Sequence, residues 1–378
     1  MRKRHTKDND NTSEGGESTN QTSNRPKNNA VTQQRLPAIN PKYDANTVLP
    51  FLFIVGILFI GIGIGVLITS LNIQEIEIDY TDCENADSKM CKEEIIEQEA
   101  VDRNCKCLIP IVLDKDWEGE ILMYYGLRNF YQNHRLYVDS KNTDQLLGKM
   151  KNYNDSEDDN AYSACDPFYC TGTVDDNDYC LNGKIYFPCG AIANSMFSDV
   201  ITLQDADNQN IPLKRTGIAW ESDKEHKFSN PEGVDSAEKL KDLLKEYAKP
   251  KDWKKNLWEL DPDNWSNNGL NNEDLIVWMR TAALPNFRKL YRRIPDGLKN
   301  GTYHLHIEYN FEVASFDGKK NIVLTTRSVL GGKNLFLGVT YIVVGGVCTI
   351  LGVIFLLVHL KWGSRIKRGK KAMEEASR

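Results

Sequence analysis

Two long apolar segments stand out from an otherwise polar chain. Val48–Leu71 contains 24 residues with no ionisable side chain, and Leu335–Leu360 contains 26 with only His359 near its end. Each exceeds the roughly 20 helical residues that cross a ~30 Å hydrocarbon core. A core helix of a water-soluble protein seldom runs so far without a polar face. Both segments are therefore predicted to span a membrane, the first as an uncleaved anchor because a long hydrophilic stretch precedes it.

The residues between these segments show the periodicity of strands. Apolar and polar positions alternate within Ile73–Tyr80, without interruption from Glu75 onward, and strictly over Tyr303–Tyr309. This pattern is typical of half-buried strands. Ile121–Tyr125 and Asn321–Ser328 are further predicted strands. In the second alternating segment the residues expected to face inward are Tyr303, Leu305, Ile307 and Tyr309.

Helices are predicted at one place and left open at another. Asp235–Lys249 carries an apolar stripe at helical spacing, with Asp235 and Glu238 as a capping box and Pro250 after its end. Leu275–Ala283 fits either a helix or a buried strand. We therefore expect a membrane protein with two transmembrane α-helices and one large, mostly antiparallel β domain of α+β type, stabilised by disulfides.

The charges of the flanks predict the orientation. Residues 1–47 carry eight basic and five acidic side chains, and residues 361–378 carry seven basic and two acidic ones. Because positive flanks stay cytosolic, both termini are expected inside and residues 72–334 outside. The residues between these flanks carry a net negative charge, which argues against nucleic acid as a partner. The expected parts are a disordered cytosolic tail (1–47), a first span (48–71), an exoplasmic domain (72–334), a second span (335–360) and a basic cytosolic tail (361–378).

Cysteine usage agrees with an oxidising compartment for the central domain. Eight of nine cysteines fall within residues 72–334 in two clusters of four, and an even count there indicates disulfides. The ninth, Cys348, is expected to be an apolar filler. A zinc site is disfavoured, because no pair has the usual spacing and no His lies within either cluster. Each cluster allows three pairings, and we expect the nested ones: Cys83–Cys107 with Cys91–Cys105, and Cys165–Cys189 with Cys170–Cys180.

Three sequons in the central domain predict N-linked glycans, at Asn154, Asn264 and Asn300. Each lies in a polar or turn-rich stretch where a glycan is sterically tolerable. The matching patterns at Asn11 and Asn20 fall in the cytosolic tail and are excluded by the predicted topology.

The search for catalytic chemistry finds no convincing site. Gly331–Lys333 lacks the first glycine of a phosphate-binding loop, and neither a nucleophile elbow nor a zincin motif is present. His304, His306 and Glu308 share one face of a strand, but residues two apart on a strand make a poor metal triad. We expect no catalytic residue, no metal and no cofactor.

The apolar segments carry glycines where a transporter would carry ionisable groups. No acid or base lies in the middle of either segment, so the chain is not expected to transport ions or protons alone. Gly338, Gly345 and Gly352 recur every seven residues on one face of the second segment. Gly61 and Gly65 form a small-xxx-small pair in the first. Such faces allow another helix to approach closely, which predicts packing against a larger membrane protein.

Several motifs resemble those of the cell division control protein 50 family, the beta subunits of type-4 P-type ATPases. The longest is MYYGLRNFYQNHR at Met123–Arg135, followed by the run Ile276–Tyr291. The resemblance extends, in the right order, from about residue 33 to 350. The other matching segments are Gln34–Ala38, Glu75–Tyr80, Pro188–Phe197, Trp220–Asp223 and Gly331–Asn334.

The resemblance implies a non-catalytic subunit in a one-to-one heterodimer with an ATPase alpha subunit. Such subunits escort the ATPase from the endoplasmic reticulum and stay bound while it moves aminophospholipid to the cytosolic leaflet. The final membrane would be endoplasmic reticulum, Golgi, endosome or plasma membrane. The resemblance also implies that the tail at Arg35, Leu36 and Pro37 touches the cytosolic face of the partner.

Two other classes of protein share some of these features. A trimeric ligand-gated channel also has two spans, internal termini and a disulfide-rich outer domain, but it needs polar pore-lining residues. An anchored enzyme of the secretory pathway needs an acid–base or nucleophile constellation. Both are disfavoured, and oligomeric state separates the channel from the subunit.

Overall fold

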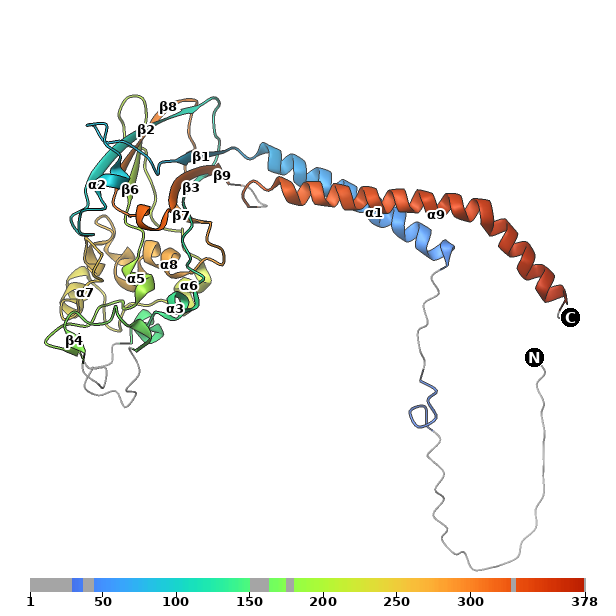
Figure 1. Cartoon of the computed structure of the whole chain (residues 1–378), viewed down its shortest axis with the longest axis horizontal. Helices are drawn as coiled ribbons and strands as arrows, with labels where there is room; N and C mark the ends of the chain where they lie inside the picture. The colour runs from blue at the N-terminus through green and yellow to red at the C-terminus, as the bar shows by residue number, and fades with distance from the viewer. Residues whose placement is uncertain (1–28, 37–43, 150–162, 175–179, 328–330, 377–378) are drawn as a thin grey trace, which may run out of the picture. The chain divides into compact units, whose positions relative to one another are not determined.

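The computed structural model describes residues 29–36, 44–149, 163–174, 180–327 and 331–376 (Figure 1). Its longest elements are the helices α1 (Ala45–Asn72) and α9 (Leu335–Ala376). Over Ala45–Asn72 and Leu335–Gly363 they are long and apolar enough to cross a membrane, which agrees with both predicted spans. Helix α9 continues past Leu360 into the basic tail, because the Lys, Arg, Ala and Glu residues there favour helix.

The described chain forms two compact units. The larger, residues 57–347, contains the β-rich central domain and the adjoining halves of both helices. The other halves of the two helices belong to the second unit.

The first sheet is antiparallel and has the order β1-β9-β3-β7. Its strands are β1 (Glu75–Asp79), β9 (Lys319–Thr326), β3 (Ile121–Arg128) and β7 (Phe287–Ile294). Three of them were predicted from the sequence, within about two residues at most ends. The strand that leaves the first helix, β1, pairs with the strand that leads into the second, β9, with Glu75 opposite Thr325.

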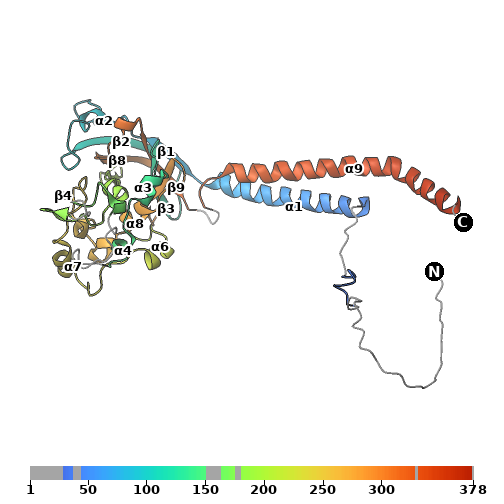
Figure 2. The same cartoon turned by 60° about the horizontal axis from the view of Figure 1, so that its bottom comes forward.

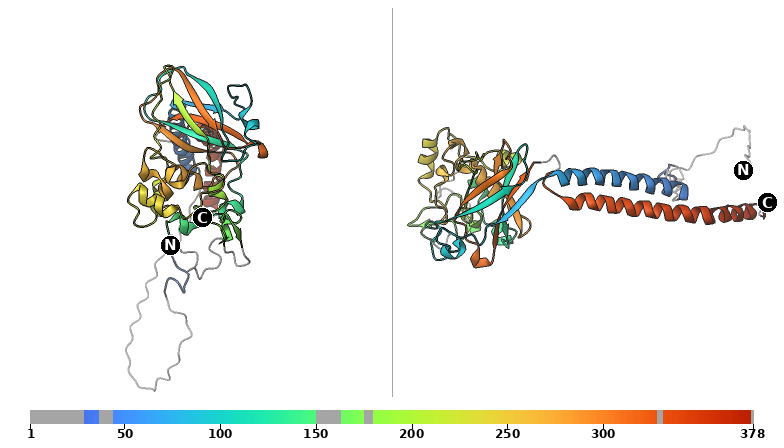
Figure 3. Two further views of the ribbon diagram at one scale, coloured as in Figure 1. Left: turned by 90° about the vertical axis from the view of Figure 1, so that its left-hand side faces the viewer. Right: turned by 90° about the horizontal axis from the view of Figure 1, so that it is seen from above.

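The second sheet is also antiparallel and has the order β2-β8-β6. Its strands are β2 (Cys105–Leu113), β8 (Gly301–Tyr309) and β6 (Val200–Gln204). The alternation predicted for β8 is confirmed, since Tyr303, Leu305, Ile307 and Tyr309 are all buried. Buried residues from both sheets belong to one core, so the sheets pack as the layers of a sandwich (Figure 3). A small ribbon pairs β4 (Thr173–Val174) with β5 (Cys180–Leu181).

Short helices connect the strands, and most of them lie on one side of the sheets (Figures 1 and 2). The α-helices are α2 (Cys91–Glu94), α3 (Arg135–Asp139), α4 (Thr143–Leu146), α5 (Ala191–Asn194), α6 (Glu221–His226), α7 (Ala237–Leu244) and α8 (Glu273–Met279). The 3-10 turns are η1 (Ser163–Cys165), η2 (Leu257–Glu259), η3 (Trp265–Asn267), η4 (Gly269–Asn271) and η5 (Ala314–Phe316).

Two helix predictions are refined by the structure. Helix α7 begins after Ser236, whose side chain accepts a hydrogen bond from the Lys239 backbone N–H. The predicted capping residue, Asp235, instead pairs with the Lys239 ammonium at 2.7 Å. The N-cap therefore lies one residue later than predicted, and the predicted capping box with Glu238 is wrong, because the third helical residue is Lys239. The ambiguous segment after Leu275 is helical as far as Met279, because Asn272 caps the Leu275 N–H at 3.0 Å.

Four disulfides join the nested pairs expected from the sequence. Cys83–Cys107 and Cys91–Cys105 fasten the segment after β1 to strand β2. Cys165–Cys189 and Cys170–Cys180 close a separate small cluster around the ribbon. Cys348 is the free cysteine among the described residues.

Candidate functional site

The predicted glycine face of α9 packs against α1 of the same chain. Gly338, Gly345 and Gly352 are all buried, so their seven-residue spacing does place them on one face. A Cβ at Gly338 would lie 3.0 Å from backbone atoms of Leu67, and one at Gly352 would lie 3.2 Å from the Phe53 ring. The prediction that this face serves a partner helix is corrected for these two glycines, because α1 occupies the space.

The glycines of α1 divide into two kinds. Gly63, which the sequence analysis did not single out, is buried, and a Cβ there would lie 2.9 Å from the Ile342 backbone nitrogen. Gly61 and Gly65 are exposed, and a Cβ at either position would meet open space out to 4 Å within the described chain. The pair Gly61 and Gly65 therefore remains the part of the predicted face that the chain does not cover.

The other predicted positions lie apart from one another. Asn300 is exposed, and the Asn264 side-chain oxygen accepts hydrogen bonds from the Ser266 backbone N–H and hydroxyl. Arg35 and Leu36 are exposed in the short described segment of the tail. Asn154 and Pro37 lie outside the described residues.

The disfavoured metal triad does not assemble. Among the described residues, the close group of potential ligands is Cys83, Cys91 and Cys107, and all three are disulfide-bonded. His304, His306 and Glu308 do not converge, and Glu308 pairs with Lys106 at 3.3 Å.

A buried ion pair holds the two sheets together. The Lys320 ammonium lies 2.7 Å from the Asp199 carboxylate, and neither side chain is exposed to solvent. Asp199 also accepts hydrogen bonds from the Tyr80 hydroxyl at 2.8 Å and from the Asn310 and Phe311 N–H groups at 2.6 Å. Burial lowers the pKa of Lys320 to about 8, although Asp199 opposes that shift.

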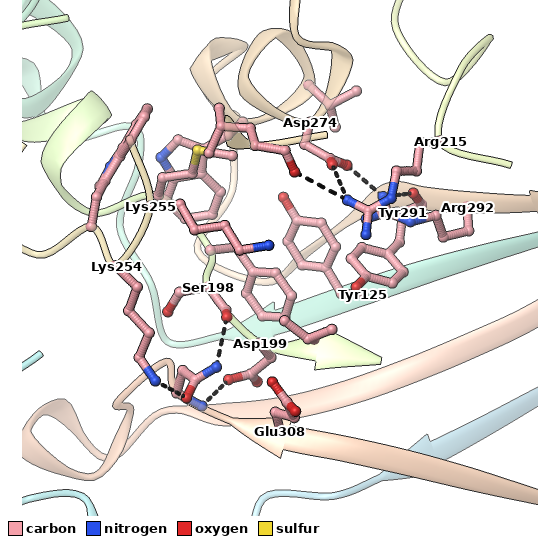
Figure 4. Close-up of a pocket in the computed structure, with 18 of the residues that line it drawn as sticks. Tyr125, Ser198, Asp199, Arg215, Lys254, Lys255, Asp274, Tyr291, Arg292 and Glu308 are labelled. Atoms are coloured by element: carbon pink, nitrogen blue, oxygen red, sulfur yellow. Dashed lines mark hydrogen bonds and ion pairs between the residues drawn. The ribbon is translucent and has the colours of Figure 1, made fainter. Parts of the chain in front are cut away.

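Beside this pair lies a pocket of about 260 Å³ with aromatic walls (Figure 4). Its walls include Tyr125, Phe197, Trp253, Trp278 and Tyr291. The Tyr125 and Phe197 rings stack with centroids 3.9 Å apart, and the Trp278 indole N–H donates to the Ile192 carbonyl at 2.7 Å. These contacts fix the walls, so the pocket is preformed. We call it the aromatic pocket.

At one end of the aromatic pocket, two arginines share one aspartate. The buried Arg292 guanidinium contacts Asp274 at 2.5 Å, and Arg215 lies 3.8 Å from the other oxygen of that carboxylate. Burial opposes the charge of Arg292, but Tyr291 and Asp274 raise its pKa. One carboxylate therefore serves two guanidinium groups.

Two lysines at the same pocket have no carboxylate partner among the described residues. Lys254 donates to the Arg103 carbonyl and to the Asn310 side chain, and burial lowers its pKa. Lys255 forms no hydrogen bond or ion pair within the described chain, and it lines the pocket. Of the other lining carboxylates, Asp199 and Glu308 pair with lysines outside the pocket lining.

The sequence analysis did not identify Asp199, Lys320 or the aromatic pocket. The partners of Asp199 lie more than 100 residues away in the chain, so no local sequence pattern predicts these contacts. One signal was present for Lys320. It shares the inward face of β9 with Ile322 and Leu324, and a lysine on such a face requires a buried partner.

Comparison with known proteins gives a consistent result. Residues 66–365 match the model of the LEM3 (ligand-effect modulator 3) family / CDC50 family. Cell cycle control protein 50A of Mus musculus is 46% identical over 350 residues, covering 89% of this chain and 90% of that protein. Cell cycle control protein 50B of Homo sapiens is 38% identical over 349 residues, covering 89% and 94%. ALA-interacting subunit 3 of Arabidopsis thaliana is 39% identical over 344 residues, covering 89% and 87%.

Proposed function

This chain belongs to the LEM3/CDC50 family, and from that membership we propose that it is a non-catalytic accessory subunit of a phospholipid-translocating P-type ATPase. It would support folding of the ATPase, its exit from the endoplasmic reticulum and its transport cycle. The partner would be one alpha subunit of the type-4 class, which flips aminophospholipid to the cytosolic leaflet. The observation that carries the proposal is the family match over most of the chain.

The membrane helices support a helper rather than a transporter. No Asp, Glu, Lys or Arg occurs in Val48–Leu71 or Leu335–Leu360, so the described spans have no ion or proton relay of their own. The name of the Arabidopsis relative, ALA-interacting subunit, describes a protein that binds another. The uncovered Gly61 and Gly65 offer a partner helix a place for close approach.

The proposed topology places both tails in the cytosol and residues 72–334 on the exoplasmic side. Basic flanks support this orientation, as do the four disulfides of the central domain. Asn154, Asn264 and Asn300 would then carry glycans, and Arg35, Leu36 and Pro37 would face the cytosolic side of the ATPase. The residence of the complex would be endoplasmic reticulum, Golgi, endosome or plasma membrane.

The test is affinity purification of the tagged chain from native membranes in mild detergent, followed by mass spectrometry and native mass determination. A P-type ATPase of much larger mass in one-to-one stoichiometry supports the proposal and names the partner. A stable homotrimer without an ATPase contradicts it and returns the channel to consideration.

A matched set of variants tests the glycine face in the same experiment. Gly61→Leu with Gly65→Leu fills the uncovered face and is expected to reduce the recovered ATPase. Ile62→Phe adds bulk in the same turn at another exposed position and is expected to leave recovery unchanged. Equal recovery of the ATPase with the natural chain, the double glycine variant and Ile62→Phe would show that Gly61 and Gly65 do not contact the partner.

A further inference from the structure

The aromatic pocket has the composition of a ligand site rather than of a packing defect. It encloses about 260 Å³, which exceeds the roughly 150 Å³ that suffice for an apolar cavity to bind benzene. Five aromatic side chains form its walls, and charged side chains from separate elements also line it (Figure 4). Apolar and aromatic walls combined with convergent polar groups are the usual form of a small-molecule site.

One of these polar groups belongs to a buried residue and has no hydrogen-bond partner among the described residues. Tyr125 is only 4% exposed, and its hydroxyl forms no hydrogen bond within the described chain, although its ring is stacked on Phe197. Burial raises the pKa of the phenol well above its ordinary value, so the hydroxyl remains a hydrogen-bond donor at neutral pH. A hydroxyl that lines a pocket and has no protein partner is satisfied by water or by a ligand.

The charge that remains unpaired at the pocket is positive. Asp274 neutralises only one of the two guanidinium groups of Arg215 and Arg292. Lys255 has no partner within the described chain, and Lys254 has only neutral acceptors. Against these stands one lining carboxylate without a cationic partner, Asp252, which accepts from the Asn194 amide at 2.7 Å. A net positive charge next to apolar walls favours an anion with an apolar body.

We propose that the aromatic pocket binds a small anionic amphiphile, with its acidic head held by Lys255, Arg215 and the Tyr125 hydroxyl. The apolar body lies against Phe197 and Trp253. Carboxylate and phosphate heads share the chemistry that this site recognises, so a fatty-acid-like and a phosphate-ester ligand are both members of the class. Because the pocket lies entirely in the central domain, the proposal does not depend on the identity of any partner subunit.

The test uses the full-length chain in lipid nanodiscs and three brominated probes. The probes are 8-bromooctanoate, 8-bromooctyl phosphate and 8-bromooctanol, since bromine quenches indole fluorescence on contact and Trp253 and Trp278 line the pocket. Saturable quenching by one or both anions, but not by the alcohol, is expected. The tighter of the two anions identifies the head group as carboxylate or phosphate.

Two variants and a control separate the pocket from the membrane. Lys255→Met keeps the aliphatic stem and removes the charge, so affinity for the anions is expected to fall about tenfold, the usual effect of losing one charge-assisted hydrogen bond. Val277→Phe fills the pocket from one wall and is expected to abolish saturable quenching. Lys251→Met removes an exposed charge nearby that does not line the pocket, and is expected to bind as the natural chain does.

The opposite result is equally clear. Quenching that rises without saturation, is equal for the alcohol and the anions, and does not respond to Lys255→Met or Val277→Phe would show partition into the bilayer alone. That outcome would overturn the proposal.

Discussion

The Lys320 ammonium lies 2.7 Å from the Asp199 carboxylate, where both side chains are fully buried. Lys320 comes from β9 of the first sheet, and Asp199 immediately precedes β6 of the second. The Lys320 ammonium also lies over the Tyr309 ring, 3.0 Å from its centroid. The contact between the two layers therefore includes one charged group of each sign.

Removing one member of this pair is expected to be costly. Lys320→Met leaves the Asp199 carboxylate buried without its cation, which destabilises by about 3–5 kcal/mol in comparable cases. Guanidinium unfolding followed by tryptophan fluorescence measures the loss. Lys319→Met, at the exposed neighbour, should change stability by less than about 0.5 kcal/mol. The double variant Asp199→Asn with Lys320→Met should cost less than the sum of the single changes, and simple additivity would contradict coupling.

The same lysine predicts a pH dependence. Burial lowers the pKa of Lys320 to about 8, from an ordinary value of 10.5. Between these values the folded chain holds fewer protons on this group than the unfolded chain, so the free energy of unfolding rises with pH. The slope from one such group is at most about 1.4 kcal/mol per pH unit. Unfolding of the natural chain and of Lys320→Met between about pH 8 and 9.5 should give a smaller slope for the variant. Identical slopes would refute this assignment.

The disulfides are expected to differ in importance. Cys91 and Cys105 are buried in the main core, whereas Cys170 and Cys180 are only partly buried in the small ribbon cluster. Losing either disulfide removes a chain-entropy contribution of about 3 kcal/mol to the free energy of unfolding. Only the loss of Cys91–Cys105 also affects the main core. Cys91→Ser with Cys105→Ser should lower the yield of monodisperse protein strongly, and Cys170→Ser with Cys180→Ser should lower it less. Equal yields would place the ribbon within the same cooperative unit.

The contact between the membrane helices depends on glycine at Gly338. A Leu there would overlap backbone atoms of Leu67, so Gly338→Leu should separate the helices. Cysteines placed at Phe59 and Tyr341, whose rings lie 5.3 Å apart, report the separation in a Cys348→Ala background. Disulfide formation between them should be slower with Gly338→Leu and unchanged with Gly61→Leu, which has open space. Equal rates in both variants would contradict the packing.

Glycan mapping tests the proposed topology. Asn264→Gln and Asn300→Gln should each remove one glycosidase-sensitive step in electrophoretic mobility, and so should Asn154→Gln. Asn11→Gln and Asn20→Gln should cause no change, because these sequons would lie in the cytosol. A glycan on either tail residue would reverse the orientation.

The architecture was predictable where the pattern is local. Strict alternation over Tyr303–Tyr309 defined β8, and uninterrupted apolar runs defined both spans. The seven-residue glycine spacing correctly indicated a shared helix face, but spacing cannot say which helix occupies it. In this chain Leu67 and Phe53 do so.

The site was less predictable because it depends on contacts between distant segments. The aromatic pocket combines Tyr125, Phe197, Lys255 and Trp278, and no periodicity connects these positions. Trp278 is completely buried and donates a hydrogen bond to the Ile192 carbonyl, so it is a core residue as well as part of the pocket wall.

The pairing of β1 with β9 has a mechanical consequence. Both strands join their membrane helices at the same end of the ladder, where Glu75 lies opposite Thr325. Two hydrogen bonds between Gln74 and Thr326, and one from the Asn334 N–H to the Ser70 hydroxyl, lie at this junction. A force that separates the helices would therefore open the ladder from this end, one bond after another, rather than shear all its bonds together. The contact between Gly63 and Ile342 lies within the helix pair, farther from the sheet than these bonds. A separating force would therefore act on the helix contact first and on the sheet afterwards.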